Sequence, residues 1–218
     1  MRIIFAIILF FGFQLSFSQK VTEREMDATD VVEIAVLADE VFSISIESEE
    51  RETVKIQAII EGEYYESVLL QVTSEAISEN KIEQRLSIGT GYTPFFEKEN
   101  DKLAAHKVIS IDLLITIPKN LKVSVSSSLA SVQAKGSFES LNVSIKNGHC
   151  LLVEFKGNTQ IHTQNGDITF YANEKSKKQY SVDAITKKGI LINHFDAGNI
   201  YHLEARSVLG NISLITSN

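Results

Sequence analysis

The sequence predicts an all-β protein in which an antiparallel β layer precedes and caps a parallel β-solenoid. Three observations lead to this prediction. Valine, isoleucine, threonine, tyrosine and phenylalanine are common, tryptophan is absent, and proline occurs only at Pro94 and Pro118. Apolar and polar residues alternate with a period of two, as in strands that bury one face. From residue 121 onward, one pattern recurs around a series of glycines.

Residues 1–18 have the layout of a secretory signal peptide. Arg2 precedes an apolar run from Ile3 to Phe13, and Ser16 and Ser18 stand where a cleavage site needs small residues. The run is shorter than the roughly 20 residues of a membrane-spanning helix. We therefore expect cleavage rather than a transmembrane anchor, and no membrane span in the mature chain. Residues 19–30 are polar and are expected to be loose.

Residues 31–120 contain six short candidate strands, many of them alternating, that are joined by acidic and polar segments. Short strands at regular intervals favour antiparallel pairing. We interpret this part as a β layer that leads into the first coil and covers its end, because an open end would expose unpaired backbone.

Residues 121–218 are interpreted as solenoid repeats aligned on Gly148, Gly166, Gly189 and Gly210, with Ala130 in the equivalent first position. Inward positions recur at fixed offsets, and those three residues before each anchor are Ser127, Ile145, Thr163, Thr186 and Ser207. Each unit would be a strand, a turn in which glycine supplies a backbone position that tolerates a positive φ, and a second strand.

The dipeptides Asn147-Gly148 and Asn165-Gly166 leave two architectures open. Asn-Gly between alternating strands is a strong β-hairpin signal, so a meander of hairpins is one alternative. Hairpins give no reason for the same inward residues at fixed offsets in five successive units. Stacked coils do, and they would place Asn147 beside Asn165 in an asparagine ladder.

The segment "ITIPKNLKVSVSSSLASVQAKG" and the coils "VSIKNGHCLLVEFKGNTQIHTQNGDITF" resemble the putative-adhesin family of bacterial envelope proteins with β-strand repeats, a domain family of unknown function. Ile117-Pro118, the turn "SSLASV" and the corner from Asn165 to Ile168 carry the resemblance, which covers roughly Val31 to the end. It implies a right-handed parallel β-helix-like fold and an extracytoplasmic location. It implies no catalytic residues. The lysines of "TKKG" depart from the pattern.

Charge and cysteine content exclude some classes of function. The chain has 21 basic and 28 acidic side chains, a net charge of −7, and loses one further positive charge if Arg2 is cleaved off. An acidic surface repels phosphate backbones, which argues against nucleic acid as a partner. The single cysteine, Cys150, cannot form an internal disulfide. Its leucine neighbours indicate a buried apolar residue rather than a reactive thiol.

No catalytic, cofactor-binding or metal-binding residues are assigned. The acidic residues of the coils share no common offset, so they indicate no acid/base pocket; they are Glu139, Glu154, Asp167, Glu174, Asp183, Asp196 and Glu204. His149 and His162 lie at different offsets and should not stack, and no histidines have zinc-ligand spacing.

A long loop from Gly89 to Lys107 contains three aromatic residues that we select as a candidate partner-contact loop, Tyr92, Phe95 and Phe96. The alternative is that the phenylalanines plug the open end of the solenoid or pack on the β layer.

These observations favour a noncatalytic envelope protein, an adhesin that presents a β-solenoid surface to an envelope protein or glycan. We expect it in the periplasm or at the cell surface, without a cofactor. One alternative is a self-assembling envelope scaffold or stress sensor that associates through its solenoid ends. Another is a polysaccharide-cleaving β-helix enzyme.

Overall fold

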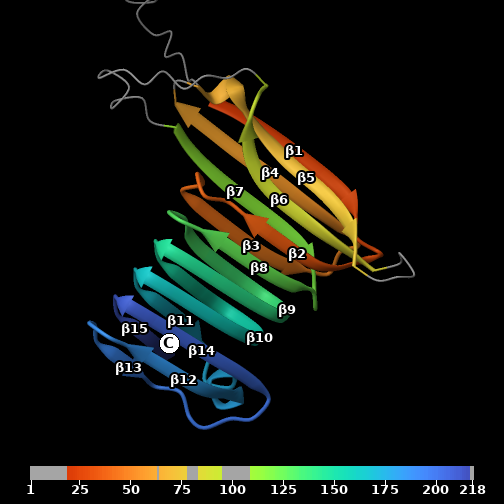
Figure 1. Cartoon of the computed structure of the whole chain (residues 1–218). Coiled ribbons are helices and arrows are strands. Elements are labelled where there is room, and N and C mark those ends of the chain that lie inside the picture. Colours follow the sequence, from red (N-terminus) through yellow and green to blue (C-terminus); the bar gives the residue numbers. More distant parts are fainter. Residues whose placement is uncertain (1–18, 63, 78–82, 95–108, 217–218) are drawn as a thin grey trace, which may run out of the picture.

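A computed structural model describes residues 19–216 apart from residues 63, 78–82 and 95–108 (Figure 1). The predicted signal peptide and the candidate contact residues Phe95 and Phe96 lie outside the described residues. The described chain forms fifteen strands and two short 3-10 helices, without an α-helix, so the predicted all-β class is confirmed. None of the described helices has the length and apolar character needed to cross a membrane.

The strands pair into one mixed sheet that wraps around a core. They are β1 (Gln19–Asp27), β2 (Val31–Leu37), β3 (Ser43–Glu49), β4 (Thr53–Gly62), β5 (Val68–Ala76), β6 (Gln84–Tyr92), β7 (Ile109–Pro118), β8 (Lys122–Ser127), β9 (Ser131–Asn147), β10 (Cys150–Asn165), β11 (Ile168–Ala172), β12 (Tyr180–Thr186), β13 (Leu191–Asn193), β14 (Tyr201–Leu209) and β15 (Ile212–Thr216). The 3-10 helices are η1 (Tyr65–Ser67) and η3 (Ser176–Gln179).

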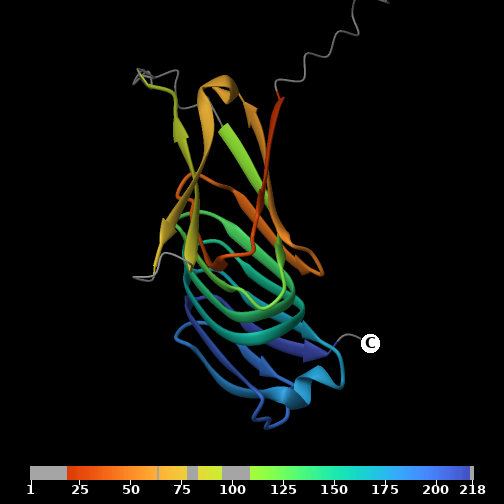
Figure 2. The same ribbon diagram turned by 90° about the vertical axis from the view of Figure 1, so that its right-hand side faces the viewer.

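The long strands β9 and β10 turn a corner, which divides the sheet into two sides (Figure 2). Register shifts and the positive φ angles of Gly136, Glu154 and Gly157 mark this corner. We call one side the front side; it runs β5-β6-β2-β8-β9-β10-β14-β12. The back side runs β1-β4-β7-β3-β9-β10-β11-β15-β13. The second halves of β9 and β10 belong to the front side and their first halves to the back side.

Parallel pairing joins stacked units that each contribute one strand to either side. In the described residues these units are, in spatial order, 31–49, 122–135, 141–153, 159–172, 201–216 and 180–193. The inward column expected from the glycine alignment is present and runs Ser127, Ile145, Thr163, Ser207, Thr186. The strands beside Asn147-Gly148 pair in parallel with other units, so the hairpin alternative is wrong.

The order of the last two units differs from the order of the sequence. Strand β14 lies between β10 and β12, and β15 lies between β11 and β13. The unit 201–216 is therefore inserted between its two predecessors, and the unit 180–193 forms the end of the stack (Figure 1). A glycine-aligned repeat defines equivalent positions but not which unit lies next to which.

The N-terminal part corrects two expectations. Antiparallel pairing does occur there, between β1 and β4, β4 and β7, and β5 and β6. However, β2 and β3 pair in parallel with β8 and β9 and form a further stacked unit. Residues 19–27 are not loose, because β1 pairs with β4 over nine residues and adds the ion pair between Lys55 and Glu23.

The interior is built from columns of residues at equivalent positions. Val143, Ile161 and Ala205 are in register on successive front strands and are buried. Near the end of the stack the core becomes aromatic: Phe155 stacks on Phe138 with ring centroids 5.1 Å apart. A larger aromatic group follows toward the end of the stack and comprises Phe170, Tyr180, Phe195 and Tyr201.

Cys150 is buried between Val132 and Ile168 of the neighbouring units, which confirms it as part of the core. Burial raises the pKa of its thiol to about 12. A thiolate is the reactive form of cysteine, so this thiol is inert while the protein is folded.

The glycine corners are fixed by close approach of the units rather than by positive φ. Of the four anchors only Gly148 has a positive φ. A Cβ on Gly166 would lie 1.7 Å from the carbonyl oxygen of Gly148, and one on Gly210 would lie 2.1 Å from that of Gly166. The tolerance of glycine for a positive φ is therefore used at one anchor, whereas close backbone approach applies at all four. The side chains of Asn147 and Asn165 form the expected ladder, with Nδ2 of Asn165 donating to Oδ1 of Asn147 at 2.7 Å.

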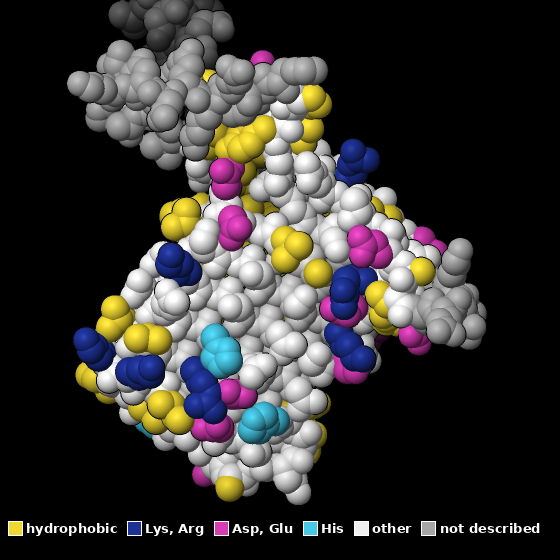
Figure 3. Space-filling model, in the orientation of Figure 1, with side chains coloured by type: hydrophobic (Ala, Val, Ile, Leu, Met, Phe, Trp, Pro, Cys, Tyr) yellow, Lys and Arg dark blue, Asp and Glu magenta, His cyan; other side chains and the backbone are white. Residues whose placement is uncertain are grey.

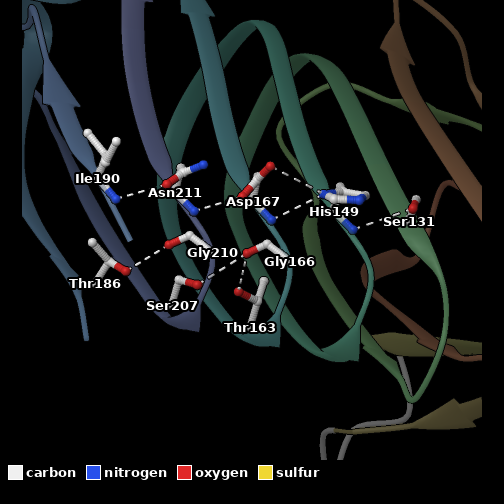
Figure 4. Close-up of polar contacts among 10 residues, drawn as sticks. All are labelled: Ser131, His149, Thr163, Gly166, Asp167, Thr186, Ile190, Ser207, Gly210 and Asn211. Carbon is white, nitrogen blue, oxygen red and sulfur yellow. Dashed lines mark hydrogen bonds and ion pairs between the residues drawn. The ribbon is translucent and has the colours of Figure 1, made fainter. Parts of the chain in front are cut away.

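A second ladder follows the residue after each anchor (Figure 4). The backbone N–H of Asp167 donates to Nδ1 of His149 at 3.1 Å, and that of Asn211 donates to Oδ1 of Asp167 at 2.7 Å. The N–H of Ile190 then donates to Oδ1 of Asn211 at 2.8 Å. Side-chain acceptors thus satisfy backbone donors that the turn leaves unpaired in the next unit.

Candidate ligand-binding surface

The front side presents columns of outward residues from the second halves of β9 and β10 and from β8, β14 and β12. Because side chains alternate along a strand, every second residue of these strands faces outward. In-register parallel pairing aligns the outward residues at spacings of about 4.8 Å. The central column, four residues before each anchor, runs in space as Ser126, Ser144, His162, Arg206 and Ile185.

The small serines of this side form the floor of an open groove. The groove has a volume of about 520 Å³ and crosses all five of these strands. Its lining comprises Asp39, Ser126, Ser127, Ser128, Ser144, Ile145, Lys146, His162, Thr163, Gln164, Ile185, Lys187, Arg206, Ser207 and Val208. A second hollow continues it toward β2 and shares Ser126, Ser144 and His162. In Figure 3 this side shows uncharged polar surface in the middle, with charged and histidine side chains around it.

The groove is positively charged on a protein that is acidic overall. Lys146, Lys187 and Arg206 line it, and Asp39 is the one acidic residue of the described lining. The Asp39 carboxylate accepts the backbone N–H of Ser128 at 3.1 Å, at the end of the groove away from β12. The two lysines are exposed and have no ion-pair partner among the described residues.

A polar cluster around Arg206 borders the groove. Its guanidinium donates to Asp183 at 2.8 Å and to Glu204. Glu204 also accepts from the amide of Gln160 at 2.9 Å, and its carboxylate lies 3.5 Å from Nε2 of His162. The hydrogen bond from Arg206 is the main reason why the pKa of Glu204 is lowered. The ionised carboxylate thereby accepts the hydrogen bond of Gln160 and lies beside His162 on the surface.

This arrangement suits recognition of a polar ligand. Serine hydroxyls, amides and imidazole can donate and accept hydrogen bonds, and the lysines add positive charge. No aromatic side chain lines the groove in the described part of the chain. The described residues also contain no group of three or more histidine, cysteine, aspartate or glutamate side chains placed to hold a metal ion.

Of the three aromatic residues selected from the sequence, Tyr92 is the one that lies among the described residues. Tyr92 ends β6, packs against the core and donates its hydroxyl hydrogen bond to Glu40. Burial is the main cause that raises the pKa of Tyr92 to about 12. The role of Tyr92, Phe95 and Phe96 as a contact loop stays a prediction.

The histidines lie apart, as their offsets predicted. His149 belongs to the corner ladder beside Asp167, and His162 lies on the front side beside Glu204. Sequence reasoning did not select the groove residues. A signal was present, because the residues four and two positions before each anchor are each polar in four of the five units, with Ile185 and Val208 as the exceptions.

The fold therefore defines a class of all-β protein in which parallel units stack and one side carries a polar groove. No family model matches the sequence, and neither does any curated protein. A solved structure described as a putative cell adhesion protein from Clostridium sporogenes aligns with a TM-score of 0.65 and 16% sequence identity. The alignment covers 91% of this chain and 100% of the other.

Two further solved structures are described as putative adhesins. The one from Bacteroides fragilis is 14% identical and aligns over 90% of this chain and 97% of its own, with a TM-score of 0.41. The one from Parabacteroides distasonis is 11% identical with the same coverages and a TM-score of 0.29. The Clostridium structure shows that this chain shares a fold with a protein described as a putative cell adhesion protein, in agreement with the resemblance found in the sequence.

Proposed function

We propose that this protein is a noncatalytic, adhesin-like envelope protein that binds a ligand in its front-side groove. The stacked units would serve as a β-solenoid, of the right-handed β-helix-like kind that the resemblance implies, and would give the groove a rigid floor. The observation that carries the proposal is the groove itself, where repeated small polar residues leave a hollow of about 520 Å³ across five strands. The fold shared with a protein described as a putative cell adhesion protein supports it.

The chemistry of the groove supports binding rather than catalysis. Its own carboxylate, Asp39, accepts the backbone N–H of Ser128. The carboxylates that border it, Asp183 and Glu204, both accept hydrogen bonds from Arg206. The lowered pKa of Glu204 keeps it ionised, whereas a general acid of a glycan-cleaving enzyme needs a raised pKa. The signal-peptide layout of residues 1–18 supports an extracytoplasmic location, in the periplasm or at the cell surface.

The proposal is tested by filling the groove. The chain without residues 1–18 is labelled and titrated onto isolated cell envelopes. We expect saturable binding that Ser144→Trp weakens at least tenfold, because the indole would occupy the floor. Gln133→Trp is the matched control, since Gln133 is an exposed residue of the back-side part of β9. Absence of saturable binding, or equal binding by both variants, would refute the proposal.

A second candidate function is self-association through the end unit. Strands β12 and β13 each pair with one neighbour in the described structure, and Ile190, Leu191 and Ile192 are exposed there. Unpaired strand edges with apolar side chains favour pairing with another chain. Strand β15, the last in the sequence, lies inside the stack between β11 and β13. Sedimentation equilibrium that finds only monomer at high concentration would exclude this function.

A further inference from the structure

We propose that the ligand of the groove is a carboxylated polysaccharide, a chain of uronic acid residues that lies across the stacked strands. This inference rests on the proposed function and adds the chemical class of the ligand. Its starting point is the contrast between an acidic protein of net charge −7 and a groove lined by three cationic side chains and one acid.

The charge of the groove is available at its two lysines. The positive charge of Arg206 is offset by its ion pairs with Asp183 and Glu204. Lys146 and Lys187 have no ion pair among the described residues, although other lysines of the sheet do. Lys122 lies 3.3 Å from Glu139, and Lys135 lies 2.8 Å from Glu47. An acidic ligand would therefore supply the counter-charge that the chain provides elsewhere but not here.

The spacing of the lysines suits a chain rather than a single small anion. Lys146 lies on β9 and Lys187 directly follows β12, and β10 and β14 lie between these strands. Three strand spacings of about 4.8 Å separate them by about 14 Å. One strand spacing is close to the length of one sugar residue in an extended chain. A carboxylated oligosaccharide of about four residues would thus reach both ammonium groups, if each step matches one strand spacing.

The residues between the lysines match the rest of a sugar chain. Ser126, Ser144 and Gln164 are exposed and offer hydroxyl and amide groups to sugar hydroxyls. Ile185 and Val208 are 49% and 37% exposed and offer apolar contact to the C–H face of a sugar ring. Interfaces with protein partners are enriched in aromatic anchor residues, and such residues are absent from the described lining.

The test uses isothermal titration of the chain without residues 1–18 with oligomers of galacturonate, alginate and hyaluronan. Methyl-esterified oligogalacturonate is the matched ligand without charge. We expect at least one acidic oligomer to bind, with an affinity that falls as salt rises and that increases with length up to about four residues. The neutral ester should bind at least tenfold more weakly.

Paired variants locate the binding. The double variant Lys146→Gln/Lys187→Gln should have a lower affinity for the acidic oligomer. We expect a loss of about tenfold or more for each lysine, because each substitution removes a charge-assisted contact. Lys122→Gln with Lys135→Gln makes the same change in net charge away from the groove and should leave affinity within about twofold. Circular dichroism confirms that both double variants are folded.

The outcomes separate this inference from the proposed function. If the neutral ester binds as tightly as the acidic oligomers, or if the two double variants weaken binding equally, the proposal of an anionic ligand is overturned and the proposed function is not. Failure of all three acidic oligomers, while Ser144→Trp still abolishes envelope binding, also overturns only the ligand class. Equally tight, lysine-dependent binding of single-stranded DNA would show a general anion surface and overturn the glycan class. If no acidic oligomer binds and Ser144→Trp leaves envelope binding unchanged, both the proposed function and the proposed ligand class are refuted.

Discussion

Replacing Gly166 with alanine tests whether close approach of the stacked units determines the glycine repeat. The added Cβ would lie 1.7 Å from the carbonyl oxygen of Gly148, whereas real contacts of this kind start near 3.0 Å. The two units would have to separate locally by about 1.3 Å, the difference between these distances. The obstacle is backbone, so no side-chain rotation can relieve it.

The expected cost follows from two contributions. Overpacking in a well-packed interior costs about 1–3 kcal/mol. The carbonyl of Gly166 also accepts the hydroxyls of Thr163 at 3.0 Å and Ser207 at 3.1 Å, and their disruption adds about 1 kcal/mol each. We expect Gly166→Ala to lower the free energy of unfolding by about 3–5 kcal/mol, a large part of the stability of a typical domain.

Urea denaturation followed by circular dichroism measures this change, since the protein has no tryptophan. Gly91→Ala is the matched control. Its Cβ would meet Nε2 of Gln71 at 2.3 Å, the mobile end of a side chain, and we expect a change within about 0.5 kcal/mol. If Gly166→Ala is as stable as the wild type, or if both variants are equally destabilised, close approach of the units does not explain the repeat.

Three further predictions concern the core and the groove. Phe155→Ala should lower the free energy of unfolding by about 3–5 kcal/mol in the same assay, because the ring is fully buried against Phe138 and Phe170; a loss below about 1 kcal/mol would contradict this. The Cys150 thiol should react with a thiol reagent only after unfolding, and rapid modification of the folded protein would contradict its burial. Because burial raises the pKa of this thiol from 9.0 to about 12, its contribution to the free energy of unfolding is present below pH 9.0 and is lost as the pH rises through about 12. Because the pKa of Glu204 is lowered, its contribution to stability is present at neutral pH and is lost as the pH falls through the folded-state pKa. Glu204→Gln should therefore reduce the loss of unfolding free energy on the acid side of its pH profile. An unchanged profile would refute the role of Arg206 in stabilising the carboxylate.

The inward columns could be predicted because stacking imposes them on the sequence. A position that faces the core in one unit faces it in all units, so Ile145 and Thr163 recur at the same offset from their glycines. The order of the units left no such trace. Thr186 and Ser207 suit the same column in either order, and only the packing of the whole chain places Ser207 beside Thr163.

The unit 31–49 was not recognised because its corner lacks the signal used for alignment. It contains no glycine, and Ile44 stands eight positions after Val36, whereas Val132 stands seven positions after the equivalent Val125. The groove was missed for another reason. Ser126 and Ser144 stand among the polar residues that alternate with the inward ones, and only the register shows that their short side chains lie together and leave a hollow.

The inserted position of residues 201–216 has a consequence for the time course of folding. A chain made or exported from its N-terminus releases β12 and β13 before the strands on which they rest, since these strands are β14 and β15. The unit 180–193 can therefore take its place in the stack only after the unit 201–216 has docked against β10 and β11. Completion of the stack then depends on a late kinetic step, and removing residues 201–216 would leave both β12 and β13 without a paired strand.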